Sequence, residues 1–136
     1  FRLAQTPVIN KVVRFITPFF IVRSSIENVF FDKSKVTDSL VERYFDLCLR
    51  EGNRQAFIDR LGIGKRNNYI NISNIKQPTL ILWGADDLLI PVENAYKFQN
   101  SLPNNKLVIL ENSGHVPMEE NPFESIKHVI EFLNTP

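Results

Sequence analysis

The chain has 136 residues, 43% of them hydrophobic and 23% charged, which is enough for one ordinary domain with a buried core. That composition excludes collagen-like, disordered and disulfide-scaffold proteins. Lys and Arg total 16 against 15 for Asp and Glu, so the net charge of +1 predicts neither a nucleic-acid partner nor a membrane-surface partner. The single cysteine, Cys48, cannot form an intrachain disulfide, which leaves the redox compartment open.

The beginning of the chain is apolar but is interrupted by charged residues. Its longest uncharged run covers residues 15–22 and is too short to cross a bilayer, so we expect no membrane span. A signal peptide would need a longer apolar region and a small-residue cleavage site, and without them we expect a cytoplasmic protein. The first residue is Phe1 rather than Met, which indicates a piece of a longer chain and leaves any upstream signal unseen.

The first half of the chain is predicted to be helical. A mixed apolar and basic segment over residues 8–22 is broken by Pro18. A helix over residues 37–50 is predicted to have Thr37 as its N-cap. A second helix is predicted over residues 53–61. The apolar face of the first helix would hold Leu40, Val41, Tyr44, Phe45 and Cys48, and that of the second would hold Ala56, Phe57 and Leu61.

The second half alternates between strand-like and helix-like runs. The runs TLILW over 79–83 and KLVIL over 106–110 are almost wholly apolar, which is typical of parallel strands covered on both faces. A helix over 92–102 joins them. A final helix over 121–133 carries a capping box made by Asn121, Pro122 and Glu124. Its buried stripe would hold Phe123, Ile126, Val129, Ile130 and Leu133. The predicted fold class is α/β.

The loops that follow the two strands are where chemistry is expected. Parallel strands end at the same edge of a sheet, and ligands in open α/β sheets bind outside that edge. The first loop offers Asp86 and Asp87, and the second offers His115, Glu119 and Glu120. A carboxylate beside His115 would hold the tautomer of the ring and stabilise its protonated form.

Each of these residues can also be explained by a structural role without catalysis. An acidic pair after a strand is often a solvated loop or a helix cap, and a lone histidine is often a surface residue. Glu119 and Glu120 precede a helix N-terminus, where the helix dipole alone accounts for them. The second histidine, His128, is expected to be a surface or packing residue, and Cys48 is expected to be a small core residue.

Other site motifs are absent from the sequence. There is no phosphate-binding glycine loop and no C-x-x-C or H-E-x-x-H spacing, so we expect no cofactor and no metal. There is also no G-x-S-x-G elbow, so the histidine has no obvious nucleophile among these residues.

The stretches TLILWGADDLLIP and NSGHVPMEENP together resemble the C-terminal third of α/β-hydrolase-fold proteins. The resemblance implies that Asp87, in the W-G-x-x-D turn, is the acid of a catalytic triad. It implies that His115, after Gly114, is the catalytic histidine. It further implies a division into a helical cap or lid over 1–72 and the C-terminal part of the hydrolase core over 73–136. In this family the nucleophile lies upstream of the cap, so none is expected in this chain.

The resemblance implies a hydrolase that cleaves an ester-like or related bond of a small apolar substrate. The alternative is a non-catalytic binding or receptor protein with the same fold, and the residue at the upstream nucleophile position would separate the two. The sequence leaves the identity of the nucleophile, the substrate and the oligomeric state open. We expect the 136 residues alone to be inactive, and poorly soluble because one strand would lack its inner neighbour.

Overall fold

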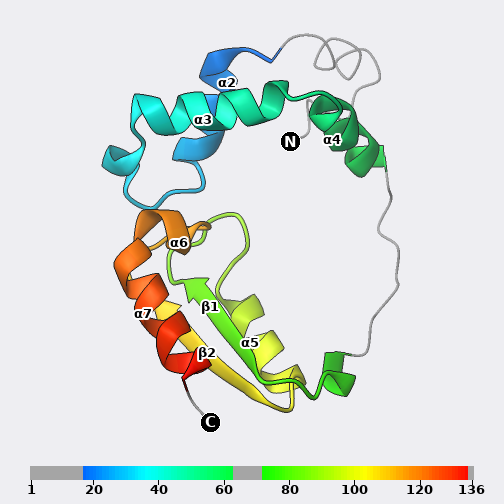
Figure 1. Cartoon of the computed structure of the whole chain (residues 1–136), viewed down its shortest axis with the longest axis vertical. Helices are drawn as coiled ribbons and strands as arrows, with labels where there is room; N and C mark the ends of the chain where they lie inside the picture. Colours follow the sequence, from blue (N-terminus) through cyan, green and yellow to red (C-terminus); the bar gives the residue numbers. More distant parts are fainter. Residues whose placement is uncertain (1–16, 63–71, 135–136) are drawn as a thin grey trace. The chain divides into compact units, whose positions relative to one another are not determined.

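The computed structural model describes residues 17–62 and 72–134. Its helices and strands follow the predicted order (Figure 1). Contacts divide the described residues into two compact units. The first contains most of helix α2 together with α3 and α4. The second contains Ile26–Val36 and everything described from Ile72 onward, including both strands.

The first unit is helical, as its apolar spacing predicts. It contains α2 (Phe19–Glu27), α3 (Asp38–Leu49) and α4 (Asn53–Gly62). Helix α2 begins directly after Pro18, which confirms a break there, whereas the rest of the predicted segment up to residue 16 lies outside the described residues. The Thr37 side chain accepts a hydrogen bond from the N–H of Leu40 at 3.2 Å, which confirms the predicted N-cap.

Two contacts hold α2 against α3 within this unit. The rings of Phe19 and Phe45 meet edge to face with centroids 5.3 Å apart. Arg23 of α2 forms an ion pair with Asp38 of α3. The predicted apolar face of α3 is covered, and its Val41 is completely buried. In α4 the predicted stripe is wrong at Ala56 and Phe57, which are exposed, while their neighbours are at most partly buried; the side chain of Leu61 lies outside the described residues.

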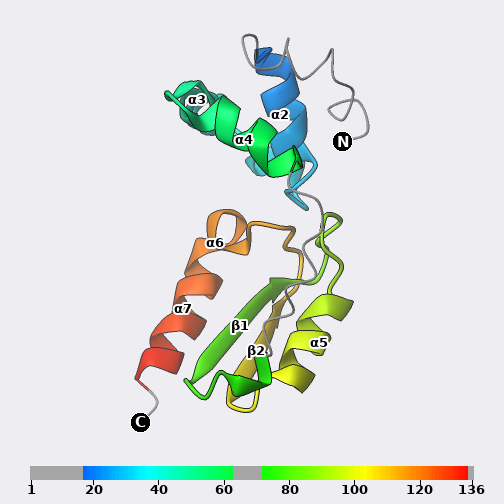
Figure 2. The ribbon, with the colours of Figure 1, turned by 90° about the vertical axis from the view of Figure 1, so that its right-hand side faces the viewer.

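The second unit is built on a parallel pair of strands. Strand β1 (Thr79–Gly84) pairs with β2 (Asn105–Leu110) in a register that sets Thr79 beside Asn105 and Gly84 beside Leu110. Helices α5 (Glu93–Ser101) and α7 (Pro122–Leu133) lie on opposite faces of the pair (Figure 2). This layering confirms the predicted α/β class, in which strands covered on both faces are apolar throughout.

The core of the second unit lies between the sheet and α5. Ile81, Ala95 and Leu102 are buried there, with Trp83 and Ile109 packed against them. Successive strand residues point to opposite faces, so alternate strand residues face α5 and the intervening ones face α7. Two one-turn helices, η2 (Lys33–Lys35) and η3 (Ile72–Asn74), and the short α6 (Pro117–Glu120) complete the unit.

Helix α7 departs from its prediction in two ways. Asn121 stands at the N-cap and Pro122 opens the helix, but the Asn121 side chain makes no capping hydrogen bond. Its amide donates instead to the Ser113 hydroxyl at 2.6 Å and to the Asn112 carbonyl at 3.1 Å. The predicted buried stripe is also wrong over most of its length. The exposed members are Phe123 (83%), Ile126 (50%), Ile130 (50%) and Leu133 (73%).

Candidate active site

The loops after β1 and β2 leave the sheet at the same edge and are bonded to each other. The N–H of Ala85 donates to the carbonyl of Leu110 at 2.9 Å, and the N–H of Asp86 donates to the carbonyl of Ser113 at 3.0 Å. These bonds continue the pairing of the strands for one further step into the loops. Each loop therefore has a fixed position relative to the other, as parallel strand order predicts.

Two glycines allow this close approach. A Cβ atom on Gly84 would lie 2.1 Å from the carbonyl oxygen of Gly114 and 2.3 Å from that of Ser113. A Cβ atom on Gly114 would in turn lie 2.4 Å from the carbonyl oxygen of Val29. All three distances are far below ordinary van der Waals contact, and the obstructing atoms are backbone. The glycines of the W-G and G-H turns are therefore required by the packing of three chain segments.

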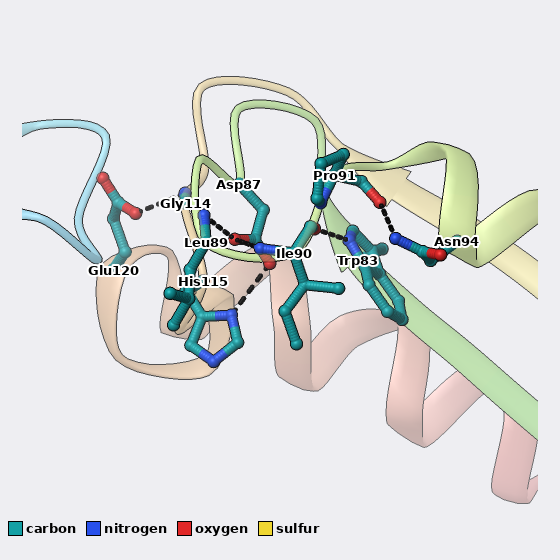
Figure 3. A network of polar contacts seen from close by, with 9 residues as sticks. All are labelled: Trp83, Asp87, Leu89, Ile90, Pro91, Asn94, Gly114, His115 and Glu120. Atoms are coloured by element: carbon teal, nitrogen blue, oxygen red, sulfur yellow. Dashed lines mark hydrogen bonds and ion pairs between the residues drawn. The ribbon is translucent and has the colours of Figure 1, made fainter. Parts of the chain in front are cut away.

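The loops bring Asp87 and His115 together. Nδ1 of His115 lies 2.8 Å from Oδ2 of Asp87 (Figure 3). The Asp87 side chain is 4% exposed, whereas that of His115 is 32% exposed. With Nδ1 donating to the carboxylate, Nε2 is the ring nitrogen left to accept a proton. The structure thus contains the acid and histidine pairing that the spacing of the two loops predicts.

The other oxygen of Asp87 is held by its own loop. Oδ1 accepts hydrogen bonds from the backbone N–H of Leu89 at 2.9 Å and of Ile90 at 2.8 Å (Figure 3). The loop is fastened further on, where the indole Nε1 of Trp83 donates to the carbonyl of Ile90 at 3.1 Å. These bonds compensate for the burial of a carboxylate and orient it towards the histidine.

Asp86, the other candidate acid, is partly exposed and forms no hydrogen bond with His115. Its backbone joins the two loops through Ser113. Of the two neighbouring aspartates, only Asp87 lies in hydrogen-bonding distance of the ring.

The predicted reading of Glu120 is wrong. The sequence alone assigns Glu119 and Glu120 to the dipole of the following helix, but Glu120 is only 2% exposed. Its Oε2 accepts from the N–H of Gly114 at 2.7 Å, and its Oε1 accepts from the N–H of Asp32 at 2.6 Å. Nothing in the local pattern separates Glu120 from Glu119, because its burial depends on a segment 88 residues away.

The remaining candidates lie away from this pairing or lack the required chemistry. His128 lies on α7, with its Nδ1 3.4 Å from Oε2 of Glu131. Cys48 lies on α3, and burial raises the pKa of its thiol, which disfavours the nucleophilic thiolate. No group of three or more His, Cys, Asp or Glu side chains suited to a metal ion occurs within residues 17–62 and 72–134. Over the same ranges, no helix has the length and apolar character needed to cross a membrane.

Relatives of this chain are hydrolases. Over 102 residues it is 30% identical to human monoacylglycerol lipase ABHD6, a match that covers 73% of this chain and 30% of that protein. The rat protein of the same name is 38% identical over 102 residues. The chain therefore spans about 30% of the length of these curated relatives.

The structure of this chain also superposes on solved structures of hydrolases. A serine hydrolase involved in carbazole degradation, the CarC enzyme, superposes with a TM-score of 0.76 at 26% identity. That match covers 90% of this chain and 49% of the other. A membrane phospholipase A superposes with a TM-score of 0.63 at 29% identity, covering 92% of this chain and 40% of the other.

The family itself is established by a family model described as the alpha/beta hydrolase fold. The model matches residues 27–122, which is well over half of the 136 residues. The matched range includes both strands and the loops that carry Asp87 and His115. With the parallel sheet between two helices and its paired loops, this match shows that the chain belongs to the α/β hydrolase fold family.

Proposed function

We propose that these residues are the C-terminal part of a hydrolase that works through a nucleophile, a histidine and an acid. His115 acts as general base towards the nucleophile and then as general acid towards the leaving group. Asp87 holds the ring in the productive tautomer and stabilises its protonated form. The single observation that carries the proposal is the 2.8 Å contact between Nδ1 of His115 and the buried carboxylate of Asp87.

The nucleophile in this proposal belongs to a part of the protein outside the 136 residues. The sequence contains no G-x-S-x-G elbow, and the monoacylglycerol lipases named above are about three times as long as the matched region. The helical unit formed by α2, α3 and α4 is the proposed lid. The division into a lid over 1–72 and a core over 73–136 remains a prediction. By its contacts, Ile26–Val36 belongs to the same compact unit as the two strands.

The proposed substrate is an ester or a related compound with an apolar acyl part. Similarity to monoacylglycerol lipases favours a fatty acyl ester over other hydrolysable bonds. The loop beside the histidine supports this choice, because Leu88, Leu89 and Ile90 are 87%, 46% and 40% exposed directly after Asp87. Apolar side chains at this edge would favour an apolar ligand through the hydrophobic effect.

The test uses the full-length protein with a monoacylglycerol and a short p-nitrophenyl ester. We expect His115→Ala to reduce kcat by at least about 10³-fold, because the general base and acid is lost. His128→Ala is the matched control, since it makes the same change at the other histidine, which lies on α7 beside Glu131. It should retain wild-type rates. Equal activity of the two variants would contradict the proposal.

The alternative is a binding or receptor protein with the same fold. It would be favoured by a full-length protein that binds an apolar ligand but turns over neither ester. Mass spectrometry after brief exposure to the p-nitrophenyl ester distinguishes the two functions, because a nucleophile that forms an acyl-enzyme gains the mass of the acyl group. Peptide mapping of the acylated protein then locates that nucleophile and shows whether it is Ser or Cys.

A further inference from the structure

Glu120 is a buried carboxylate that joins two distant segments of the second unit. It ends α6, five residues after His115, and is 2% exposed. One oxygen accepts from the N–H of Gly114 and the other from the N–H of Asp32. Figure 3 shows Glu120 directed at Gly114, on the opposite side of the turn from the contact between Asp87 and His115.

The arrangement calls for a carboxylate rather than a neutral side chain of the same shape. Glutamine has one acceptor oxygen and one NH₂ group, so an amide here would direct its own donors at one of the two backbone N–H groups. That N–H would then be buried without a partner, which is costly. The ionised carboxylate accepts from both at once, and bonds to charged acceptors are the stronger kind.

These bonds fix the backbone on which His115 stands. The N–H of His115 donates to the carbonyl of Val29 at 2.7 Å. Gly114 packs its backbone on the same segment, since a Cβ atom there would lie 2.8 Å from the backbone nitrogen of Phe31. Residues 29–32 therefore lie directly against the turn at Gly114 and His115. Glu120 accepts hydrogen bonds from both, through Asp32 and Gly114.

The exposed side of the same segment is tied to the same place. Nζ of Lys35 donates to the backbone carbonyl of Glu120 at 2.8 Å and to Oδ1 of Asn121 at 2.7 Å. The lysine therefore meets the backbone of Glu120 while the carboxylate meets backbone N–H groups. Three hydrogen bonds therefore attach the segment between α2 and α3 to Glu120 and Asn121, one from the backbone of Asp32 and two from the side chain of Lys35.

We propose that Glu120 is a positioning residue for His115. Its carboxylate sets the turn at Gly114 and His115 against residues 29–32, and so holds the imidazole where it meets Asp87. The proposal rests on the proposed function only for its effect on turnover. Its effect on the geometry of the ring can be measured without a substrate.

Glu120→Gln in the full-length protein tests the effect on turnover. We expect kcat to fall about 100-fold with KM little changed, because a displaced base slows the reaction without weakening binding of the substrate. Glu124→Gln is the matched control: it makes the same chemical change on an exposed side chain four residues away, and its rates should stay within about twofold of wild type. Wild-type kcat in Glu120→Gln would overturn the proposal.

Proton NMR of the same proteins tests the geometry of the ring. The Nδ1 proton that His115 shares with Asp87 should give a low-field resonance in the wild type and in Glu124→Gln. In Glu120→Gln this resonance should be lost or broadened by exchange with water. A fall in kcat with an unchanged resonance would overturn the positioning role. If the wild-type protein hydrolyses no ester, the proposed function fails, and the resonance alone decides the role of Glu120.

Hydrogen exchange of the wild type tests the proposal even if Glu120→Gln does not fold. The amides of Gly114 and Asp32 should exchange at least about 100-fold more slowly than in an unstructured peptide, because each is bonded to the buried carboxylate. Exchange of either amide at the unprotected rate would overturn the proposal.

Discussion

The two oxygens of Asp87 serve different neighbours. Oδ1 accepts from the N–H groups of Leu89 and Ile90, while Oδ2 faces Nδ1 of His115. This division fixes the orientation of the carboxylate, so that only Oδ2 can accept a hydrogen bond from the ring of His115. It also predicts what an amide would do in its place, because the two backbone donors leave only one position for the amide oxygen.

Asp87→Asn should therefore reverse the hydrogen bond to the histidine. The amide oxygen would stay with the two backbone N–H groups, and the NH₂ group would donate to Nδ1 of His115. The proton would then reside on Nε2, so the ring could no longer act as the base. We expect kcat of the full-length protein to fall about 10³- to 10⁴-fold, as measured by steady-state ester hydrolysis.

The control for this variant is Asp86→Asn, which removes the same charge one position earlier. It should leave the rates within about threefold of wild type, as expected of a partly exposed loop residue. A large loss in Asp86→Asn and none in Asp87→Asn would exchange the roles of the two aspartates.

At the scale of elements, the two strands act through the contact between the loops that follow them. Gly84 ends β1 and meets the backbone of Ser113 and Gly114 after β2. The two residues after Gly84 continue the strand pairing into the loops, with Ala85 donating its N–H to Leu110 and Asp86 donating its N–H to Ser113. The distance between Asp87 and His115 is consequently a property of the sheet edge, and a side chain at the glycine would act on both loops together.

Gly84→Ala should separate the loops and cost about 3 kcal/mol of unfolding free energy, because the obstructing atoms are backbone and cannot rotate away. Ester hydrolysis should fall with it. Gly52→Ala is the contrasting control: its φ of 83° disfavours alanine, but a Cβ atom there meets nothing within 4 Å. It should cost only about 1 kcal/mol and leave turnover unchanged. Denaturant unfolding measures both, and equal costs would refute the steric explanation.

Sequence patterns predict those elements whose causes are local. Thr37 caps α3 by accepting a hydrogen bond from the N–H of Leu40, only three residues further along the chain. The apolar runs of the two strands identify a parallel pair that is covered on both faces. The pairing of Asp87 with His115 follows from that topology. Glu120 could not be identified in this way, because its partner Asp32 is 88 residues away. The buried side of α7 could not be predicted either. Apolar residues lie around much of this helix, and the described residues cover only some of them.

At the scale of the whole molecule, the second unit leaves a large apolar surface uncovered among the described residues. Phe123 and Leu133 of α7 are 83% and 73% exposed, and Leu88, in the loop between β1 and α5, is 87% exposed. Each strand also has only one strand neighbour within the described part of the chain. Surfaces of this kind are normally covered by further structure or by a partner.

The 136 residues produced alone should therefore self-associate and bind a hydrophobic dye such as ANS. Size-exclusion chromatography and dye fluorescence measure the two effects. A variant with Phe123→Lys and Leu133→Lys should bind less dye and elute closer to the monomer, because both changes place charge on the exposed stripe. A monomeric wild-type chain without dye binding would contradict the prediction.

The anchoring of residues 29–35 also has a consequence for exchanging parts between relatives. Glu120 reaches the chain at Asp32 and Lys35, both before α3 begins. Helices α3 and α4 follow the anchored segment, which ends at Val36, and the second unit resumes at Ile72 among the described residues. A chimera that replaces only the residues between these two points would carry foreign helices yet keep each hydrogen bond described for Glu120. The alignment of the histidine would then be kept from this chain, whichever relative supplies α3 and α4.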